Sequence, residues 1–353
     1  MSQRRACITG IGLATAQGDD AASTWDRLLG GVSLHEPGHV PLTRDVSVSR
    51  VSQLAQHVAQ QALRESNWHD TSHRTALIVG TSKGPIDEWL GAGNDLSLGV
   101  SEPAVKLAHA LTITGPVLTI AAACASGLQA LVRAKMMIDN NEADRVIVIG
   151  VESSLHVLFE ASFKRLGVIA RRDIGCRPFD TTREGFLIAE AAAAVCVEAV
   201  DSPGAIFIER AIIGSDPTHL TGIAPDGEPL RRLLRHVIDD SPVDLVHAHG
   251  TGTIMNDAVE LAAIEACCTG LPNVYSHKHA LGHTQGAAGL LAVVINVLAH
   301  RTGTIPPNSL TQNAMPHTRV VIENTMSRRA VDSSVVIGAG FGGAMACVRL
   351  GTR

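Results

Sequence analysis

The sequence predicts an α/β fold in which helices cover buried sheets. Short apolar runs of strand length alternate along the chain with runs of helical periodicity. Hydrophobic residues make up 45% of the 353 residues and aromatic residues only 3%, so the core consists of small and branched aliphatic side chains. After Asp201-Ser202-Pro203-Gly204, the strongest linker signal in the chain, the same rhythm begins again. The pattern therefore predicts one large domain or two medium ones.

The first half contains five expected strands and four expected helices. The strands are expected at residues 5–13, 75–79, 116–120, 145–150 and 191–198. The helices are expected at residues 21–29, 51–63, 101–111 and from about 124 to 139. Apolar residues of the second helix recur at i, i+3, i+4 and i+7, which is typical of an amphipathic helix. Ser101 can cap the N-terminus of the third helix, and Pro103 in its first turn also indicates a helix start.

The second half repeats this order of elements. Strands are expected at residues 205–214, 244–249, 273–276, 319–323, 335–338 and 345–350, and helices at residues 228–238, 258–267 and 285–301. Each half has a strand, a loop of small residues and an Ala/Gly-rich helix near its middle, at 117–139 and 273–301. This similarity indicates an internal duplication, with halves at residues 1–203 and 204–353.

Composition and charge argue against several classes of protein. The formal net charge of −5 gives no support for a nucleic-acid surface, which needs a basic footprint. No uncharged apolar stretch reaches the length of a transmembrane helix, and the N-terminus lacks the apolar region of a signal peptide. The seven cysteines form no CxxC pair, so we expect neither a metal site nor a disulfide framework. We therefore expect a reduced, cytoplasmic protein without a membrane or nucleic-acid partner.

Cys124 lies where an expected strand ends and an expected helix begins. Free backbone N–H groups and the helix dipole favour negative charge at a helix N-terminus. A thiolate is stabilised there, so we expect the pKa of Cys124 to fall. The alternative is a buried structural cysteine, which this local pattern does not exclude.

Two loops of small residues carry histidines and a lysine. His249 stands in His247-Ala248-His249-Gly250-Thr251-Gly252-Thr253 at a strand end, where α/β folds build their sites. Lys278 and His283 stand in a loop that enters an Ala/Gly-rich helix, so both groups need partners or shifted pKa values. Glu260 either caps its own helix or pairs with Lys278, whereas Asp257 is expected to cap only.

The run Gly338-Ala339-Gly340-Phe341-Gly342-Gly343 follows a strand near the C-terminus. A dinucleotide site is improbable here, because no βαβ unit follows the glycines. The alternative is that the loop offers a backbone N–H group to an oxyanion.

Taken together, these stretches resemble the β-ketoacyl synthase family, of the elongating Cys-His-His kind. The resemblance extends over almost the whole chain and rests on motifs in the family's order. They are residues 5–12, Ala123-Cys124-Ala125-Ser126-Gly127, Arg177-Pro178-Phe179-Asp180-Thr181-Thr182-Arg183-Glu184-Gly185-Phe186, His249-Gly250-Thr251-Gly252-Thr253, Lys278, Gly282-His283-Thr284 and Gly340-Phe341-Gly342-Gly343. The resemblance implies the thiolase fold, in which duplicated βαβαβαββ halves form five α-β-α-β-α layers. A thiolase itself would use a late cysteine, but Cys347 lacks a matching motif.

The resemblance also implies an activity and residue roles. Cys124 would accept an acyl group, and His249 and His283 would assist decarboxylation of a malonyl-type thioester before carbon–carbon bond formation. Lys278, with Glu260, would orient His283. Phe341, which stands between Gly340 and Gly342, would gate the pocket and would complete an oxyanion hole with Cys124. No cofactor or metal is implied. The partners would be an acyl carrier protein or coenzyme A thioesters, in a homodimer or a heterodimer with a related subunit.

The resemblance leaves two alternative functions open, and the chain departs from the family's pattern in two ways. The chain could be a non-elongating acyltransferase or decarboxylase, or a chain-length-factor-like partner subunit. Ala189-Glu190-Ala191 replaces a Gly-Glu-Gly turn, so we expect that turn to be reshaped. The chain is shorter than typical members in three segments, at residues 32–50, 84–106 and 168–176. In the family the second of these segments helps to form the acyl pocket and the dimer interface. Carrier docking is expected at Arg171-Arg172 or at Arg231-Arg232-Arg235.

Overall fold

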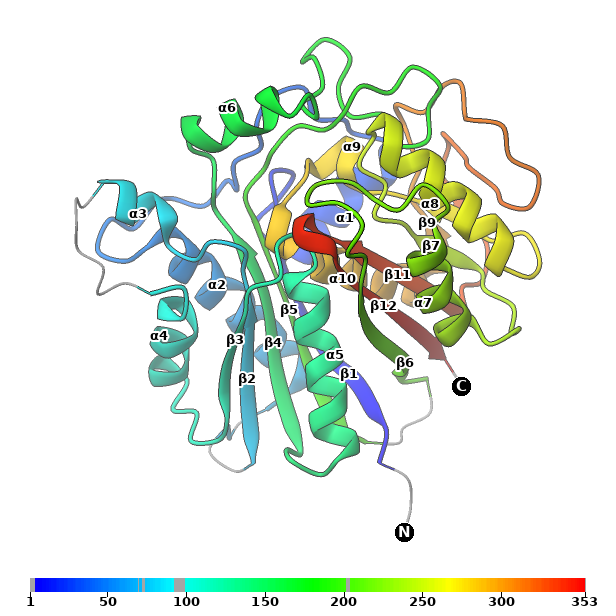
Figure 1. The fold of residues 1–353 in the computed structure, drawn as a ribbon. Coiled ribbons are helices and arrows are strands. Elements are labelled where there is room, and N and C mark those ends of the chain that lie inside the picture. The colour runs from blue at the N-terminus through cyan, green and yellow to red at the C-terminus, as the bar shows by residue number, and fades with distance from the viewer. Residues whose placement is uncertain (1–3, 69, 72–73, 92–98, 201–203, 353) are drawn as a thin grey trace.

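The computed structural model describes residues 4–68, 70–71, 74–91, 99–200 and 204–352 (Figure 1). The strands of the first half are β1 (Ala6–Ala14), β2 (Thr75–Gly80), β3 (Val117–Ile120), β4 (Arg145–Glu152) and β5 (Ala191–Ala199). Its helices are α1 (Ala21–Leu29), α2 (Arg50–Ser66), α3 (Ile86–Gly91), α4 (Glu102–Ala110), α5 (Ser126–Asp139) and α6 (Val157–Arg165).

The second half contributes a matching set of elements. Its strands are β6 (Ile206–Ser215), β7 (Leu245–His247), β8 (Asn273–Tyr275), β11 (Ser333–Ala339) and β12 (Ala344–Thr352), beside the short pair β9 (Thr304–Ile305) and β10 (Ser327–Arg328). Its helices are α7 (Glu228–Ile238), α8 (Ile254–Cys267), α9 (Lys278–Leu281) and α10 (Ala288–Thr302).

The two sets of five strands share one topology. The first set lies in the order β3-β2-β4-β5-β1 and the second in the order β8-β7-β11-β12-β6, each read from its outer edge. The sense of every pairing also matches: β2 is parallel to β3 and β4, as β7 is to β8 and β11. β5 is antiparallel to β4 and β1, as β12 is to β11 and β6. The βαβαβαββ pattern predicted for each half is therefore present. The predicted boundary at residue 203 lies outside the described residues.

Five layers result from this duplication (Figure 1). Helices α2 and α4 cover the outer face of the first sheet, and α7 and α8 cover the outer face of the second. Helices α5 and α10 lie between the sheets and contact strands of both. Helix α10 is buried almost throughout, which explains why its sequence is apolar on all sides. The two sheets meet where β1 pairs with β6.

Two sequence-based expectations need correction. Residues 319–323 form no strand, because their pairing with β8 is limited to an isolated bridge between Val321 and Asn273. Helix α8 begins four residues earlier than expected, so Asp257 lies inside the helix. Neither Ala189 nor Ala191 has a positive φ, and a turn reshaped relative to Gly-Glu-Gly stays a prediction. The Ala189 side chain packs where the chain comes close at Gly38 and Gly282.

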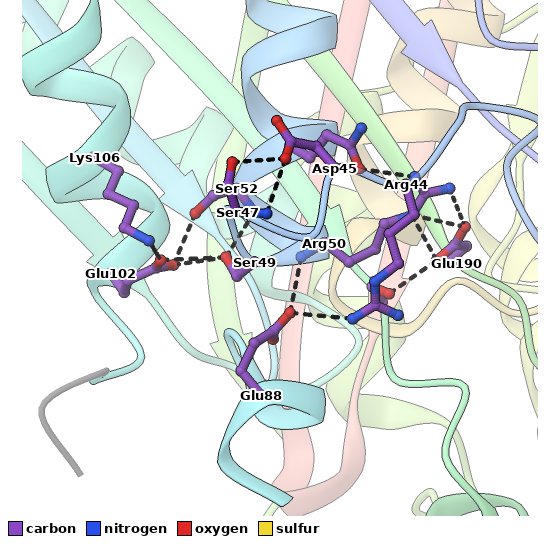
Figure 2. A network of polar contacts seen from close by, with 12 residues as sticks. Arg44, Asp45, Ser47, Ser49, Arg50, Ser52, Glu88, Glu102, Lys106 and Glu190 are labelled. Atoms are coloured by element: carbon purple, nitrogen blue, oxygen red, sulfur yellow. Dashed lines mark hydrogen bonds and ion pairs between the residues drawn. The ribbon is translucent and has the colours of Figure 1, made fainter. Parts of the chain in front are cut away.

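A buried ion pair fastens the segment before α2 to the first sheet (Figure 2). Arg50 donates to the Glu190 carboxylate at 2.7 Å and to the carbonyl groups of Val40 and Leu42 at 2.9 Å. Glu190 also accepts hydrogen bonds from the Val40 N–H and the Ser153 hydroxyl. Both charged side chains are less than a tenth exposed. A pair of this kind costs much free energy to break, because the remaining charge stays buried.

Candidate active site

Cys124 lies in the turn between β3 and α5, where the chain leaves the sheet. Ala123, just before it, has a φ of 47°, in the left-handed region that a residue with a Cβ rarely adopts. The Ser126 hydroxyl holds this turn, because it donates to the Ala123 carbonyl at 2.6 Å and accepts from the Ala122 N–H at 2.9 Å. The tight turn presents the half-buried Cys124 at the mouth of a 14-residue helix.

The thiol of Cys124 is harder to ionise than the sequence predicted. Burial raises the pKa of Cys124 to about 11, although the positive charges of Lys83 and Lys278 act in the opposite direction. The expectation of a lowered pKa was therefore wrong for the resting protein. It took the helix terminus into account but not the low-dielectric surroundings of the sulfur, which disfavour the charged form.

The glycine-rich loop after β11 lies against the backbone of Cys124. A Cβ added to Gly340 would come within 2.9 Å of the Cys124 nitrogen. The N–H groups of Gly340 and Gly342 donate to the carbonyl groups of Ala344 and Leu220, so they are engaged. Between them, the N–H of Phe341 has no acceptor among the described residues, and neither has the N–H of Cys124. The Phe341 N–H of this loop and the Cys124 N–H are therefore available, within the described part of the chain, to donate to a bound group.

The loop after β7 is held from two sides. The Glu260 carboxylate of α8 accepts the backbone N–H groups of His249 and Gly250 at 2.6 and 2.8 Å. The ammonium group of Lys278 donates to the carbonyl of His249. Glu260 and Lys278 thus both bind the backbone around His249. We expected these two side chains to orient His283. Burial raises the pKa of Glu260 to about 7 and lowers the pKa of Lys278, which Glu260 partly offsets.

His283 is fixed by its backbone and by its ring. Its N–H donates to the Leu187 carbonyl at 2.7 Å, and its Nδ1 accepts the N–H of Gln285 at 3.1 Å. Because Nδ1 accepts, the proton of the neutral ring is on Nε2. Burial and the charge of Lys278 lower the pKa of His283 well below its usual range. The ring therefore points a neutral N–H donor away from the Gln285 backbone.

The two imidazoles stand together behind a row of aromatic rings. The ring centroids of His249 and His283 are 5.6 Å apart, and burial lowers the pKa of His249 as it does that of His283. Phe186 packs edge-on against His283 at 4.6 Å. Phe163 of α6 bridges Phe186 and Phe341, at 5.7 and 6.3 Å. Two neutral imidazoles thus lie in a site whose outer wall is aromatic.

Sequence reasoning missed a polar network beside Cys124. Glu152, fully buried at the end of β4, accepts from the Ser82 N–H at 2.9 Å, the Ser154 hydroxyl at 2.5 Å and the Gly286 N–H at 3.2 Å. Lys83 follows Ser82 and donates to the side-chain carbonyl of Gln285. The sequence analysis assigns no role to the loop Gly80-Thr81-Ser82-Lys83-Gly84. Its lysine between small residues at a strand end was the available signal.

Further histidines are buried around this site. His247 bonds to Asn296 and to His277 at 2.8 Å each, and His279 bonds to the Ser276 carbonyl at 2.8 Å. Burial lowers the pKa of His247 to about 3 and that of His279 to about 4. The protein therefore holds several imidazoles neutral at pH values where an unfolded chain would charge them.

Other predicted features have plainer surroundings. Cys347 is fully buried in β12. Arg171, Arg172 and Arg235 are exposed, but each has a carboxylate partner, at 3.3, 2.5 and 2.8 Å respectively. The described residues contain no group of three or more potential ligands that could hold a metal ion. Within the same residues, no helix has the length and apolar character needed to cross a membrane.

Comparison with known protein families gives two matches that together cover most of the chain. The family described as "Beta-ketoacyl synthase, N-terminal domain" matches residues 40–202, and "Beta-ketoacyl synthase, C-terminal domain" matches residues 205–311.

Individual proteins show the same similarity. The chain is 31% identical to a protein of Mycobacterium leprae named 3-oxoacyl-[acyl-carrier-protein] synthase 2, over 85% of both chains. It is 28% identical to a polyketide β-ketoacyl synthase of Streptomyces coelicolor, over 97% of this chain and 87% of that one. Among solved structures, the ishigamide ketosynthase/chain length factor superposes with a TM-score of 0.89 over the full length of both chains, at 23% identity. This last similarity concerns the fold alone.

Proposed function

Because the chain belongs to the β-ketoacyl synthase family, we propose that it catalyses decarboxylative Claisen condensation of a malonyl-type thioester with an acyl group carried on Cys124. The observation that carries the proposal is the site's donor set. The site combines one cysteine with two neutral imidazoles and with two backbone N–H groups that have no acceptor among the described residues. Such a set fits a reaction that passes through a thioester, an enolate and a tetrahedral oxyanion.

The first step is acylation of Cys124. Its sulfur attacks the thioester carbonyl, and the N–H groups of Cys124 and Phe341 stabilise the oxyanion that forms. Collapse of this intermediate releases the carrier thiol and leaves the acyl group on the enzyme. Phe341, whose ring packs 6.3 Å from that of Phe163, would gate the entry of the second thioester.

The second step generates the carbon nucleophile. Loss of carbon dioxide from the malonyl group places negative charge on the thioester oxygen, and the Nε2–H of His283 and the ring of His249 donate to that oxygen. The resulting carbanion attacks the acyl carbonyl on Cys124, and the sulfur leaves. Neutral imidazoles suit this role, because they stabilise charge that appears only in the transition state.

The proposal includes an acyl carrier protein as the donor of both groups. The exposed Arg171 and Arg172 border α6, since Arg172 also lies 3.9 Å from Glu160. An acidic carrier docked there would stand next to the helix that holds Phe163 against Phe341.

We further propose a dimer and a cytoplasmic location. The outer edge of β3 has no strand partner among the described residues, and its Val117 and the neighbouring Val105 of α4 are exposed. An open apolar sheet edge favours pairing with a second chain, either identical or related. All seven cysteines are free thiols, which suits a reducing compartment.

The test is a condensation assay read by mass spectrometry. The protein is mixed with an acyl-carrier thioester and malonyl-carrier, and a β-keto product two carbons longer supports the proposal. Cys124→Ala is expected to abolish both the acyl-enzyme and the product. Carbon dioxide release or acyl transfer without chain extension would instead indicate a non-elongating enzyme. Absence of Cys124 acylation with any carrier would indicate a partner subunit.

A further inference from the structure

A second lysine, Lys83, carries a positive charge that acts on Cys124. Lys83 belongs to the loop that follows β2, and β2 pairs with β3 up to Gly80 and Ile120. The Thr81 N–H continues this pairing, because it donates to the Ile120 carbonyl at 3.1 Å. The loop that carries Lys83 therefore runs beside the segment that carries Cys124.

The ammonium group of Lys83 is held by neutral groups only. It donates to the Ser82 hydroxyl at 2.9 Å and to the side-chain carbonyl of Gln285, and it lies 4.8 Å from the ring centre of Phe159. None of the ion pairs between described residues includes Lys83. Two acceptors leave one of its three N–H groups free, and the aromatic ring shields it from water.

The nearest carboxylate is separated from Lys83 by a hydroxyl group. Ser82 accepts from Lys83 and donates to Glu152, whose oxygens also receive the Ser82 N–H, the Ser154 hydroxyl and the Gly286 N–H. The carboxylate of Glu152 is thus satisfied by hydrogen bonds rather than by a cation. The positive charge of Lys83 is not consumed by a direct ion pair and remains effective towards the site.

Lys83 also connects Cys124 with His283. Gln285 accepts from Lys83 through its side chain and donates to Nδ1 of His283 through its backbone. Consistent with this position, the positive charge of Lys83 acts to lower the pKa of both His283 and Cys124. Its effect on the pKa of Cys124 is larger than that of Lys278. The ammonium group of Lys278 instead bonds to the His249 carbonyl.

We propose that Lys83 is a positioning residue of the reaction centre, whose ammonium group stabilises the thiolate of Cys124 for attack on the acyl thioester. This inference rests on the proposed function. In the step concerned, the bond between Sγ and the acyl carbon forms and the bond between that carbon and the carrier sulfur breaks. The proton lost by Cys124 ends on the departing carrier thiol.

Three charged groups act on the sulfur of Cys124. Lys83 and Lys278 stabilise negative charge there, Glu152 opposes it, and His249 and His283 are neutral. Glu152 and Lys83 thus act on the same thiol with opposite signs from one hydrogen-bonded network. A thiol buried this deeply needs a nearby cation, because burial alone disfavours the reactive form.

The test measures ionisation of Cys124 in the resting protein. The rate of iodoacetamide alkylation is followed by mass spectrometry of the Cys124 peptide between pH 6 and 11. Lys83→Met is expected to raise the apparent pKa by about one unit, which leaves about tenfold less thiolate at pH 8. Lys83→Arg is expected to retain the wild-type profile. Lys164→Met removes an exposed lysine of α6 and is the matched control.

Glu152→Gln supplies the decisive comparison. Removal of the negative charge is expected to lower the apparent pKa of Cys124, in the direction opposite to Lys83→Met. Local disorder would shift both variants the same way, so a common direction refutes the proposal. An unchanged profile in Lys83→Met also refutes it. The assay uses no acyl substrate, so its result stands apart from success or failure of the condensation assay.

Discussion

Replacement of Gly340 by alanine tests whether the Phe341 N–H serves the oxyanion. Gly340 has an extended backbone, with φ −139° and ψ 155°, so alanine causes no strain there. Its new Cβ would lie 2.9 Å from the Cys124 nitrogen and 3.0 Å from the Ala122 carbonyl oxygen. Both are backbone atoms, and ordinary contacts begin at 3.4 Å, so the loop must move away from Cys124.

That displacement moves the Phe341 donor relative to the sulfur. Complete loss of one oxyanion donor lowers kcat by about 10²–10³-fold. A shift of several tenths of an ångström weakens the donor without removing it, so we expect a loss of about 10- to 100-fold. The assay is single-turnover acylation of Cys124 by an acyl-carrier thioester, followed by intact-protein mass spectrometry.

Gly342→Ala is the matched control for this variant. Gly342 has a φ of 80° and nothing within 4 Å of an added Cβ, and its N–H is bonded to the Leu220 carbonyl. Alanine there should lower the free energy of unfolding by about 1 kcal/mol through backbone strain, with acylation close to wild type. Equal acylation rates in the two variants would refute the oxyanion role of the Phe341 loop.

Two further predictions concern stability. Arg50→Met leaves the Glu190 carboxylate buried without its cation, so urea unfolding at pH 7 should show a loss of about 3–5 kcal/mol. Arg44→Met removes an ion pair whose arginine is 57% exposed and should cost no more than about 1 kcal/mol, and equal losses would contradict the argument. Burial lowers the pKa of His300 to about 4. The contribution of the neutral ring to the free energy of unfolding is therefore fully present above pH 6.5 and is lost as the pH falls towards 4. His300→Gln should therefore reduce the slope of stability against pH in that interval by up to about 1.4 kcal/mol per pH unit, and an unchanged slope would show that His300 does not titrate there.

The regular elements were mostly predictable because each is encoded by a local pattern. The strands β2 and β4 are continuous apolar runs, and α2 has its apolar residues on one side. Residues 319–323 look like a strand in sequence, but their pairing with the edge strand β8 is limited to one bridge, between Val321 and Asn273. Strand identity is decided by pairing partners, which lie far away in the chain.

Charge states at the site were not predictable from local sequence. The helix terminus beside Cys124 suggested an easily ionised thiol, but the pKa depends on every atom that excludes water from the sulfur. In the same way, Lys278 bonds to the His249 carbonyl rather than to His283 or Glu260. Such contacts depend on how loops from different strands converge at one end of the sheets.

The sequence by itself determined the nucleophile candidate, the two histidine loops and the duplicated α/β pattern, because each is a short motif or a local periodicity. Only the tertiary structure decided the surroundings of Cys124. It brought Lys83 and Glu152, which are 41 and 28 residues from Cys124 in sequence, to the same thiol. It also left the Phe341 N–H free while both neighbouring glycines found acceptors. Parallel strands end at one edge of a sheet, so residues distant in sequence become neighbours only after the strands have paired.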